Sequence, residues 1–267
     1  MSEPPLLRVD KLEVVYHRTI TAVQGISLAV EAGQIVAILG SNGAGKSTTL
    51  RAISGFLGID DARVTDGSVT YKGRRIENRP PHEIARLGVV LAPERDKVFP
   101  NLTVAENLAA PFAPSASQRT ASEDFVYHFF PQLAGLHHRP AGLLSGGERQ
   151  ILALASALVC CPQLLLIDEL SLGLAPAIVD ELMARLVQIR RELGITMLVV
   201  EQNAAAALAV ADYGYVLENG RCVLDGDSAR LRAHGDIQEF YLGQSPGSAR
   251  GSYRAVKQYR RSRRWYG

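Results

Sequence analysis

The chain has 267 residues, of which 47% are hydrophobic and 21% are charged, and its formal net charge at pH 7 is +2. This composition suits one large or two small domains with a sizeable core, and it excludes dependence on disulfide staples. The near balance of charge disfavours a body that binds nucleic acid electrostatically, and no run reaches the roughly 18 consecutive apolar residues of a membrane span. Residues 1–5 lack the pattern of a secretory signal, so we expect a cytosolic protein.

Strand and helix patterns alternate through the first third of the chain. Apolar runs bounded by turn residues predict strands at 6–16, 26–30, 34–39, 67–71 and 88–92. Helical patterns lie at 46–56 and 81–87. This alternation predicts a mostly parallel sheet.

A glycine-rich segment follows the strand predicted at 34–39. Its sequence is Gly40-Ser41-Asn42-Gly43-Ala44-Gly45-Lys46-Ser47-Thr48, and a helical pattern comes next. Such glycines let successive backbone N–H groups turn toward one anion, while Lys46 can reach the β and γ phosphates and Ser47 can offer its hydroxyl to Mg²⁺. We therefore predict a P-loop that binds a nucleoside triphosphate. A glycine-rich turn that holds nothing is the alternative, and the full string disfavours it.

Strand patterns fade between residues 94 and 161, where helical spacing recurs. Helices are predicted at 103–109 and 123–133, joined by a link rich in Pro, Ala and Ser at 111–117. We therefore divide residues 1–243 into a core, formed by 1–93 and 162–243, and a helical insert at about 94–161.

The three cysteines are Cys160, Cys161 and Cys222. The adjacent pair lies in an apolar stretch, with no His or further Cys at the spacing of metal ligands. We expect all three to be buried, reduced thiols.

Two acidic residues follow the short apolar strand predicted at 164–167. The strand brings Asp168 and Glu169 to its carboxyl end, where ligands gather in open α/β sheets. Asp168 can hold Mg²⁺ through its water shell, and Glu169 can polarise the water that attacks the γ-phosphate. A plain helix N-cap is the alternative interpretation of this pair.

The last strongly patterned segments are a helix at 176–193 and a strand at 196–200. The helical spacing places Ile178, Leu182, Leu186 and Ile189 toward the core. Residues 244–267 carry seven Lys or Arg residues and no acidic one, which predicts a basic tail. The tail is either a solvated disordered end or a segment that binds anionic lipid headgroups or nucleic acid.

A second phosphate-binding candidate is Leu144-Ser145-Gly146-Gly147-Glu148-Arg149-Gln150, which opens the apolar helix at 151–159. Ser145 and the amides of Gly146 and Gly147 would direct donors at a phosphate from a helix N-terminus. A simple helix cap explains the Ser and the glycines but not the whole heptapeptide.

With this heptapeptide between the P-loop and the acidic strand end, residues 6–242 resemble the nucleotide-binding subunits of ABC transporters. The resemblance implies an α/β P-loop NTPase with a mostly parallel core sheet, an antiparallel β subdomain and a helical subdomain. It also implies a head-to-tail dimer, in which ATP lies between the P-loop of one subunit and the heptapeptide of the other. Tyr16 falls where the family places an aromatic that stacks on adenine, although a strand Tyr is also ordinary half-buried packing.

Further segments resemble the second ATPase subunit of high-affinity branched-chain amino-acid importers. They are Pro93-Glu94-Arg95, Val98-Phe99-Pro100, 102–108, 171–176, Val200-Glu201-Gln202-Asn203 and 215–220. This resemblance implies two permease subunits, a sister ATPase in a heterodimer or a second copy in a homodimer, and an external solute-binding protein. It places the chain peripherally on the cytoplasmic face of the membrane. Urea, short amides or aromatic acids are alternative solutes.

ABC ATPases that act on nucleic acid or the ribosome form a competing class. The short stretch between Ser47 and Ser145 leaves no room for a long coiled coil, and the single P-loop excludes a tandem type. We therefore expect no specific nucleic acid partner.

Three positions depart from the general family pattern. Glu94 stands where most relatives carry a glutamine and would bind Mg²⁺ or its waters, and Gln202 stands where most carry a histidine and would donate to the γ-phosphate. Without that histidine, we expect the electrostatics of the site to vary little from pH 6 to 8. Leu170 replaces a proline of the importer branch, so we expect the loop after it to be less rigid and hydrolysis somewhat slower.

Overall fold

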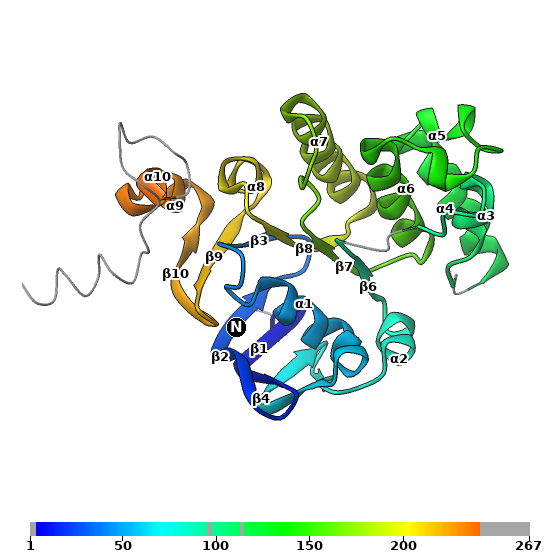
Figure 1. The fold of residues 1–267 in the computed structure, drawn as a ribbon. Coiled ribbons are helices and arrows are strands. Elements are labelled where there is room, and N and C mark those ends of the chain that lie inside the picture. Colours follow the sequence, from blue (N-terminus) through cyan, green and yellow to red (C-terminus); the bar gives the residue numbers. More distant parts are fainter. Residues whose placement is uncertain (1–3, 95–97, 113–114, 241–267) are drawn as a thin grey trace, which may run out of the picture.

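Two β-sheets and the helices packed on them make up residues 4–94, 98–112 and 115–240, which the computed structural model describes (Figure 1). The predicted basic tail and Arg95 lie outside these residues. The antiparallel sheet has the order β2 (Ile20–Val30), β1 (Leu7–Tyr16), β4 (Ala62–Tyr71), β5 (Arg74–Arg75). The larger sheet has the order β10 (Arg221–Asp227), β9 (Tyr213–Glu218), β3 (Ile35–Gly40), β8 (Thr196–Glu201), β7 (Leu164–Asp168), β6 (Val89–Ala92).

Within the larger sheet, neighbouring strands from β9 to β6 pair in parallel, and β10 pairs antiparallel with β9. The predicted mostly parallel core sheet with an antiparallel β subdomain is therefore confirmed. The helices are α1 (Lys46–Ser54), α2 (Pro81–Arg86), α3 (Val104–Ala109), α4 (Ala116–Phe129), α5 (Gln132–Gly135), α6 (Gly146–Val159), α7 (Pro176–Leu193), α8 (Ala204–Val210), α9 (Ser228–Ala233) and α10 (Gly235–Phe240). Short 3₁₀ turns span Phe56–Asp60 and Ala141–Leu143.

The central strand β3 is buried along its whole length because both of its faces are covered. Val36 and Ile38 face the cluster formed with α1 and the antiparallel sheet, whereas Ala37 and Leu39 face α8 and α9. Figure 1 shows α1 and the antiparallel sheet on one side of the larger sheet and α7 and α8 on the other. Burial on both faces explains why this strand is apolar throughout rather than alternating.

Several predicted boundaries differ from the observed ones. β2 and β4 begin earlier, at Ile20 and Ala62, because their exposed halves carry polar residues that hide the strand pattern. The helix predicted at 46–56 ends at Ser54, where Gly55 adopts a left-handed C-cap. The helix predicted at 123–133 is two helices, α4 and α5, because Pro131 cannot donate the next helical hydrogen bond. The proposed bounds of core and insert remain predictions.

The three cysteines are free but only half-buried, so the expectation of fully buried thiols is wrong. Cys160 and Cys161 lie where α6 ends and the chain turns toward β7, which brings them nearer the surface than the helix interior. In the part of the chain that the structure describes, no group of three or more His, Cys, Asp or Glu side chains could hold a metal ion.

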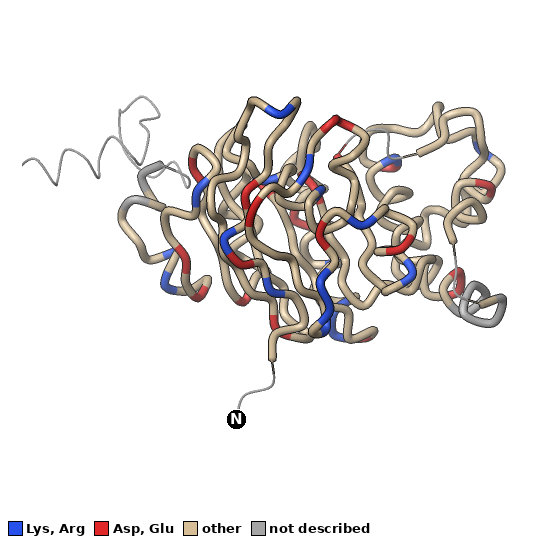
Figure 2. Tube along the Cα trace, turned by 90° about the horizontal axis from the view of Figure 1, so that it is seen from below, with Lys and Arg blue, Asp and Glu red and all other residues tan. Residues whose placement is uncertain are grey.

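None of the helices among the described residues is both long and apolar enough to cross a membrane. Basic and acidic residues are interspersed along the described chain in the view of Figure 2, as the near balance of composition predicts.

The core face of α7 differs from the predicted one at its first turn. Leu182, Leu186 and Ile189 are buried, but Ile178 is 36% exposed. Val179 takes the core position instead, because residues 179, 182, 186 and 189 follow the helical period more closely. The prediction for Ile178 is therefore wrong.

This difference gives a stability test. Leu186→Ala removes a fully buried side chain, so it should lower the free energy of unfolding by about 2–5 kcal/mol. Ile178→Ala should change it by less than about 1 kcal/mol, because that side chain is already partly in water. Urea unfolding of both variants measures the difference, and equal losses would contradict the observed helix face.

Candidate nucleotide-binding and hydrolysis site

The P-loop follows from the way β3 ends. Gly40 passes so close to the backbone of Leu217 that a side-chain carbon at position 40 would collide with its carbonyl oxygen. Gly45, the N-cap of α1, has φ 96°, a left-handed value that glycine adopts without strain. Between these two glycines the chain reverses sharply and delivers Lys46 to the first turn of α1.

Lys46 is buried, with 4% of its surface exposed, and its ammonium group has two oxygen partners. Nζ donates to the carbonyl oxygen of Ser41 at 3.1 Å and lies 3.2 Å from Oε1 of Glu169. The side chain of Glu169 is also buried, so this ion pair is shielded from water. The P-loop lysine and the predicted catalytic glutamate are therefore in direct contact.

Ser47 and Asp168 meet across the gap between α1 and β7. The hydroxyl of Ser47 donates to Oδ1 of Asp168 at 2.9 Å, so a hydroxyl and a carboxylate lie side by side. Hydroxyl and carboxylate oxygens are ligands that Mg²⁺ accepts. The structure thus brings together two of the three residues predicted to serve the metal. The third, Glu94, lines the same hollow as Ser47, which is described below.

The pKa of Asp168 is raised to about 6, mainly by burial and in smaller part by the nearby carboxylates of Glu169 and Glu94, while the hydrogen bond from Ser47 opposes the rise. The carboxyl group therefore titrates at the acid edge of the range from pH 6 to 8. The expectation that the electrostatics of the site vary little across this range is therefore wrong at Asp168. The reason is desolvation, which the sequence pattern did not reveal.

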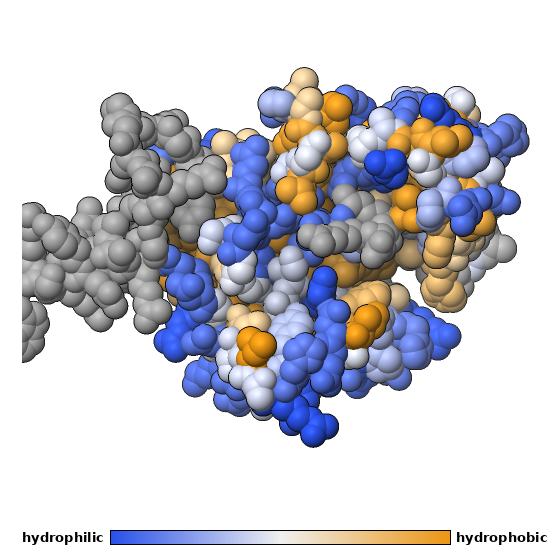
Figure 3. Space-filling view, viewed as in Figure 1, coloured by the Kyte–Doolittle hydropathy of each residue, from blue (hydrophilic) through white to orange (hydrophobic). Residues whose placement is uncertain are grey.

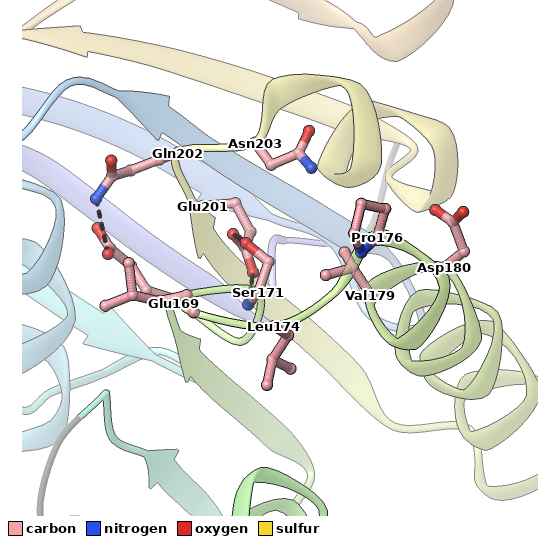
Figure 4. A pocket seen from close by; sticks show the side chains of 11 residues that line it. Glu169, Ser171, Leu174, Pro176, Val179, Asp180, Glu201, Gln202 and Asn203 are labelled. Atoms are coloured by element: carbon pink, nitrogen blue, oxygen red, sulfur yellow. Dashed lines mark hydrogen bonds between the residues drawn. The ribbon is translucent and has the colours of Figure 1, made fainter. Parts of the chain in front are cut away.

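Glu169 forms two hydrogen bonds with the end of β8 and the residue that follows it. Its N–H donates to the carbonyl oxygen of Val200 at 2.9 Å, and its Oε2 accepts from Nε2 of Gln202, also at 2.9 Å (Figure 4). The same amide nitrogen lies 2.5 Å from Oδ1 of Asn42 in the P-loop. Glu169 is not a helix N-cap, because α7 begins at Pro176 with Ala175 as its N-cap, so that alternative is wrong.

These residues surround one open hollow of about 320 Å³, here named the P-loop hollow. Its lining residues are Asn42, Gly43, Gly45, Lys46, Ser47, Thr48, Glu94, Glu169, Leu172 and Gln202. A side-chain carbon at Gly43 would meet nothing within 4 Å, so the backbone there is open to a ligand. Glycine backbone, one cation, two hydroxyls and two carboxylates form a donor set that fits a phosphate chain with Mg²⁺.

Tyr16 is half-buried beside the P-loop rather than in the hollow. Its hydroxyl lies 3.3 Å from Oγ1 of Thr48, and either oxygen can be the donor. This contact ties β1 to the first turn of α1. Adenine stacking on Tyr16 remains a prediction.

The heptapeptide that opens α6 stands apart from the P-loop hollow. Ser145 is the N-cap of α6, where its Oγ accepts from the N–H of Glu148 and its N–H donates to Oε2 of Glu148. Gly147 lies against Ile178 at the start of α7. Ser145, Gly146 and Gly147 do not line the hollow, so one chain does not bring them to its own P-loop.

Glu201 is a residue to which the sequence analysis assigned no role. It ends β8, is fully buried, and accepts hydrogen bonds from both the N–H and the hydroxyl of Ser171. Burial raises its pKa, whereas the hydrogen bonds from Ser171 lower it. An acidic residue at the end of an otherwise apolar strand was the available signal, and its partner could be found only from the fold.

Comparison with known proteins decides the family. The model of the ABC transporter family matches residues 23–171, which is more than half of the chain. The chain belongs to this family. It is an ABC ATPase that couples ATP hydrolysis to transport.

This chain matches nearly the whole length of three relatives whose names describe transport proteins. BraG of Pseudomonas aeruginosa, a high-affinity branched-chain amino acid transport ATP-binding protein, is 41% identical over 89% of this chain and 100% of its own. LivF of Archaeoglobus fulgidus, a probable branched-chain amino acid transport ATP-binding protein, is 36% identical over 89% of this chain and 99% of its own length. BraF of Pseudomonas aeruginosa, a high-affinity branched-chain amino acid transport ATP-binding protein, is 30% identical over 90% of this chain and 99% of its own length.

A solved structure has the same fold. The ADP conformation of an ATP-binding cassette of an ABC transporter superposes with a TM-score of 0.76 at 26% identity, covering 90% of this chain and all of the other.

The buried position of Asp168 predicts how stability depends on pH. The pKa of Asp168 is raised from 3.8 to about 6, so between these pH values the folded state binds more protons than the unfolded state. The free energy of unfolding therefore falls as the pH rises through this range. Asp168→Asn lacks this titration and still accepts from Ser47. Without nucleotide and Mg²⁺, the variant should match the wild type near pH 4 and exceed it at pH 7.5 by about 2–3 kcal/mol.

Urea unfolding across this pH range measures the difference. Asp124→Asn, on the exposed face of α4, is the control and should show no such divergence. Parallel pH profiles for the wild type and Asp168→Asn would contradict the raised pKa.

Proposed function

We propose that this ABC ATPase drives an importer of branched-chain amino acids (leucine, isoleucine and valine) across the cytoplasmic membrane. The chemical part of the proposal rests on one hollow, which is lined by Lys46, Ser47, Glu169 and Gln202. Asp168 lies next to it, where it accepts from the hydroxyl of Ser47. The names of the relatives BraG and LivF, which match along nearly their full length, support the choice of solute.

In this proposal the P-loop, residues 40–48, cradles the triphosphate. The backbone N–H groups around Gly43 and Gly45 and the dipole of α1 face the phosphates. Lys46 binds the β and γ phosphates, and in the structure its ammonium group is paired with Glu169. ATP must therefore replace one ion pair by another, which frees the carboxylate of Glu169 at the moment when the γ-phosphate arrives.

Ser47, Asp168 and Glu94 would serve Mg²⁺. Ser47 and Asp168 present adjacent oxygens, and Glu94 contributes a further carboxylate to the lining. When bound, Mg²⁺ neutralises phosphate charge and fixes the geometry of the phosphate chain. Deprotonation of Asp168, whose pKa is about 6, leaves it ionised for this task at neutral pH.

Glu169 acts as the general base that polarises the attacking water, and Gln202 lies beside it. The Gln202 amide now donates to Glu169 and to Asn42, and the same donor can turn to the γ-phosphate. Both side chains line the P-loop hollow from the end of the larger sheet.

A second ATPase subunit completes the site. Ser145, Gly146 and Gly147 lie at the N-terminus of α6 and do not reach the P-loop of their own chain. We propose that they bind the γ-phosphate held by the P-loop of a partner, in a head-to-tail dimer. The similarity to both BraG and BraF favours a heterodimer with a sister ATPase, and a homodimer is the alternative.

The permease contact is proposed on the apolar patch formed by Phe99 and Leu143. These side chains are 59% and 65% exposed, and they lie on adjacent segments because the N–H of Gly142 donates to the carbonyl oxygen of Pro100. Figure 3 shows hydrophobic side chains reaching the surface in the region of helices α3 to α7, whereas the region of the antiparallel sheet is mostly hydrophilic. Two permease subunits and an external solute-binding protein would complete the importer, with this chain on the cytoplasmic face.

The substitution Glu169→Gln tests the hydrolysis mechanism. The variant should keep its affinity for ATP within about threefold but lose at least about 100-fold in turnover, because an amide cannot accept a proton from water. Phosphate release and ATP binding measure the two effects separately. Undiminished phosphate release would show that another group is the base.

Purification from gently solubilised native membranes tests the importer. The tagged wild-type chain should recover two permeases and a second ATPase, and the solute-binding protein of that system then distinguishes branched-chain amino acids from urea, short amides or other acids. The double variant Phe99→Asp with Leu143→Asp should lose the permeases, since charge disrupts an apolar contact. Ile59→Asp, at a side chain that is 74% exposed on another segment, should retain them. Recovery of ribosomes or nucleic acid alone would favour the competing class of ABC ATPases.

A further inference from the structure

The last two residues of β8 and the residue after it form hydrogen bonds with the residues that follow β7. The carbonyl oxygen of Val200 accepts from the N–H of Glu169, and the side chain of Gln202 donates to the side chain of Glu169. Between them, Glu201 accepts from Ser171. One strand end thus fixes both the proposed base and the start of the loop at 171–175.

Glu201 uses its whole carboxylate for this purpose. Oε1 accepts from the N–H of Ser171 at 2.9 Å, and Oε2 accepts from its hydroxyl at 2.5 Å (Figure 4). The side chain is fully buried, and a buried carboxylate costs several kcal/mol unless it is paired or hydrogen-bonded. Both of these donors belong to one loop residue, and the backbone of Leu170, just before the loop, adds a further favourable hydrogen bond to the carboxylate. The carboxylate is therefore fully stabilised while the loop stays in place.

The loop has two further contacts: the N–H of Leu174 donates to the carbonyl oxygen of Ser171 at 3.2 Å, and the side chain of Leu174 packs against the core. A hollow of about 260 Å³ lies beside it, lined by Glu169, Ser171, Leu172, Gly173, Leu174, Pro176, Val179, Asp180, Glu201, Gln202 and Asn203. Leu172 is 50% exposed and Gly173 has φ 74°, so neither anchors the loop by packing. Leu170 is buried in the core and anchors the chain just before the loop.

Glu169 itself needs support from its surroundings. Its φ of 49° is left-handed, which is unfavourable for a residue with a side chain. Such a conformation persists only when neighbouring contacts determine it. The side chain of Glu169 is paired with Lys46 and accepts from Gln202, and its N–H donates to Val200. The buried side chain of Leu170 and the anchoring of Ser171 two residues later hold the backbone that follows.

We propose that Glu201 is a positioning residue for ATP hydrolysis. Its two hydrogen bonds to Ser171 hold the loop at 171–175 and keep Glu169 aimed into the P-loop hollow. They supply the rigidity that a proline at position 170 would otherwise provide, so the loop need not be looser because Leu170 stands there. This inference rests on the proposed role of Glu169 as the general base.

Two substitutions at Glu201 separate its hydrogen bonds from its charge. Glu201→Leu removes both acceptors at similar volume, and it should lower kcat by about 10–100-fold while the Kd of ATP stays within about threefold. Glu201→Gln should retain kcat within about threefold, because its oxygen accepts from the N–H of Ser171 and its amide donates to the hydroxyl. The rescue by Gln is a result that general loss of packing would not give.

The matched control is Glu77→Leu. Glu77 also accepts from a backbone N–H, that of Val69, but it lies in the turn after β5 and does not line the P-loop hollow, so its removal should leave kcat unchanged. Ser171→Ala should lower kcat less than Glu201→Leu does. Adding Ser171→Ala to Glu201→Leu should lower kcat no further, since the two residues act as one unit.

Hydrogen exchange gives a readout that does not depend on turnover. Glu201→Leu should speed amide exchange at 171–175 by about tenfold or more and leave 41–48 unchanged, whereas Glu201→Gln should change neither. Wild-type kcat in Glu201→Leu, or an equal loss of kcat and ATP affinity, would overturn the proposal, as would unchanged exchange. If the wild type itself released no phosphate, the proposed function would fail, and the exchange experiment would still decide whether Glu201 holds the loop.

Discussion

The registers of three parallel strands determine where the site residues lie. In the pairing of β3 with β8, Leu39 is opposite Glu201, and in the pairing of β7 with β8, Asp168 is opposite Val200. Because parallel strands end at the same edge of the sheet, the P-loop, the acidic pair and the end of β8 converge there. A slip of one residue along β8 would exchange the directions of Glu201 and Gln202. The buried core that fixes the registers is therefore also what assembles the site.

The second constraint is that buried acidic groups outnumber buried basic groups at the site. Lys46, Asp168, Glu169 and Glu201 are each at most 6% exposed, so one buried cation stands among three buried carboxyl groups. Glu169 is paired with Lys46, whereas Glu201 and Asp168 have hydrogen-bond donors but no buried cation as partner, and burial raises the pKa of both. A divalent cation that arrives with the nucleotide would offset this excess of negative charge, so the electrostatics of the site favour the metal complex of ATP.

Local patterns in the sequence were sufficient to predict the P-loop, the acidic end of β7 and the mostly parallel sheet. These features depend on runs of adjacent residues, such as the glycines between Gly40 and Gly45 and the apolar strand before Asp168. The bonds of Glu201 to Ser171 join residues 30 positions apart, so no local pattern announces them. The exposure of Ile178 and the raised pKa of Asp168 likewise depend on which elements pack against them, and this information comes only from the fold.

At position 169, the backbone and the chemistry favour different amino acids. A left-handed φ of 49° suits Gly or Asn, and either would relieve about 1 kcal/mol of strain there. Neither can take a proton from water as a carboxylate does. A carboxylate is therefore present at this position against the preference of its own backbone. Replacing Glu169 by Gly or Asn would relieve that strain but would leave the buried ammonium group of Lys46 without its carboxylate partner, so the ion pair outweighs the backbone preference at this position.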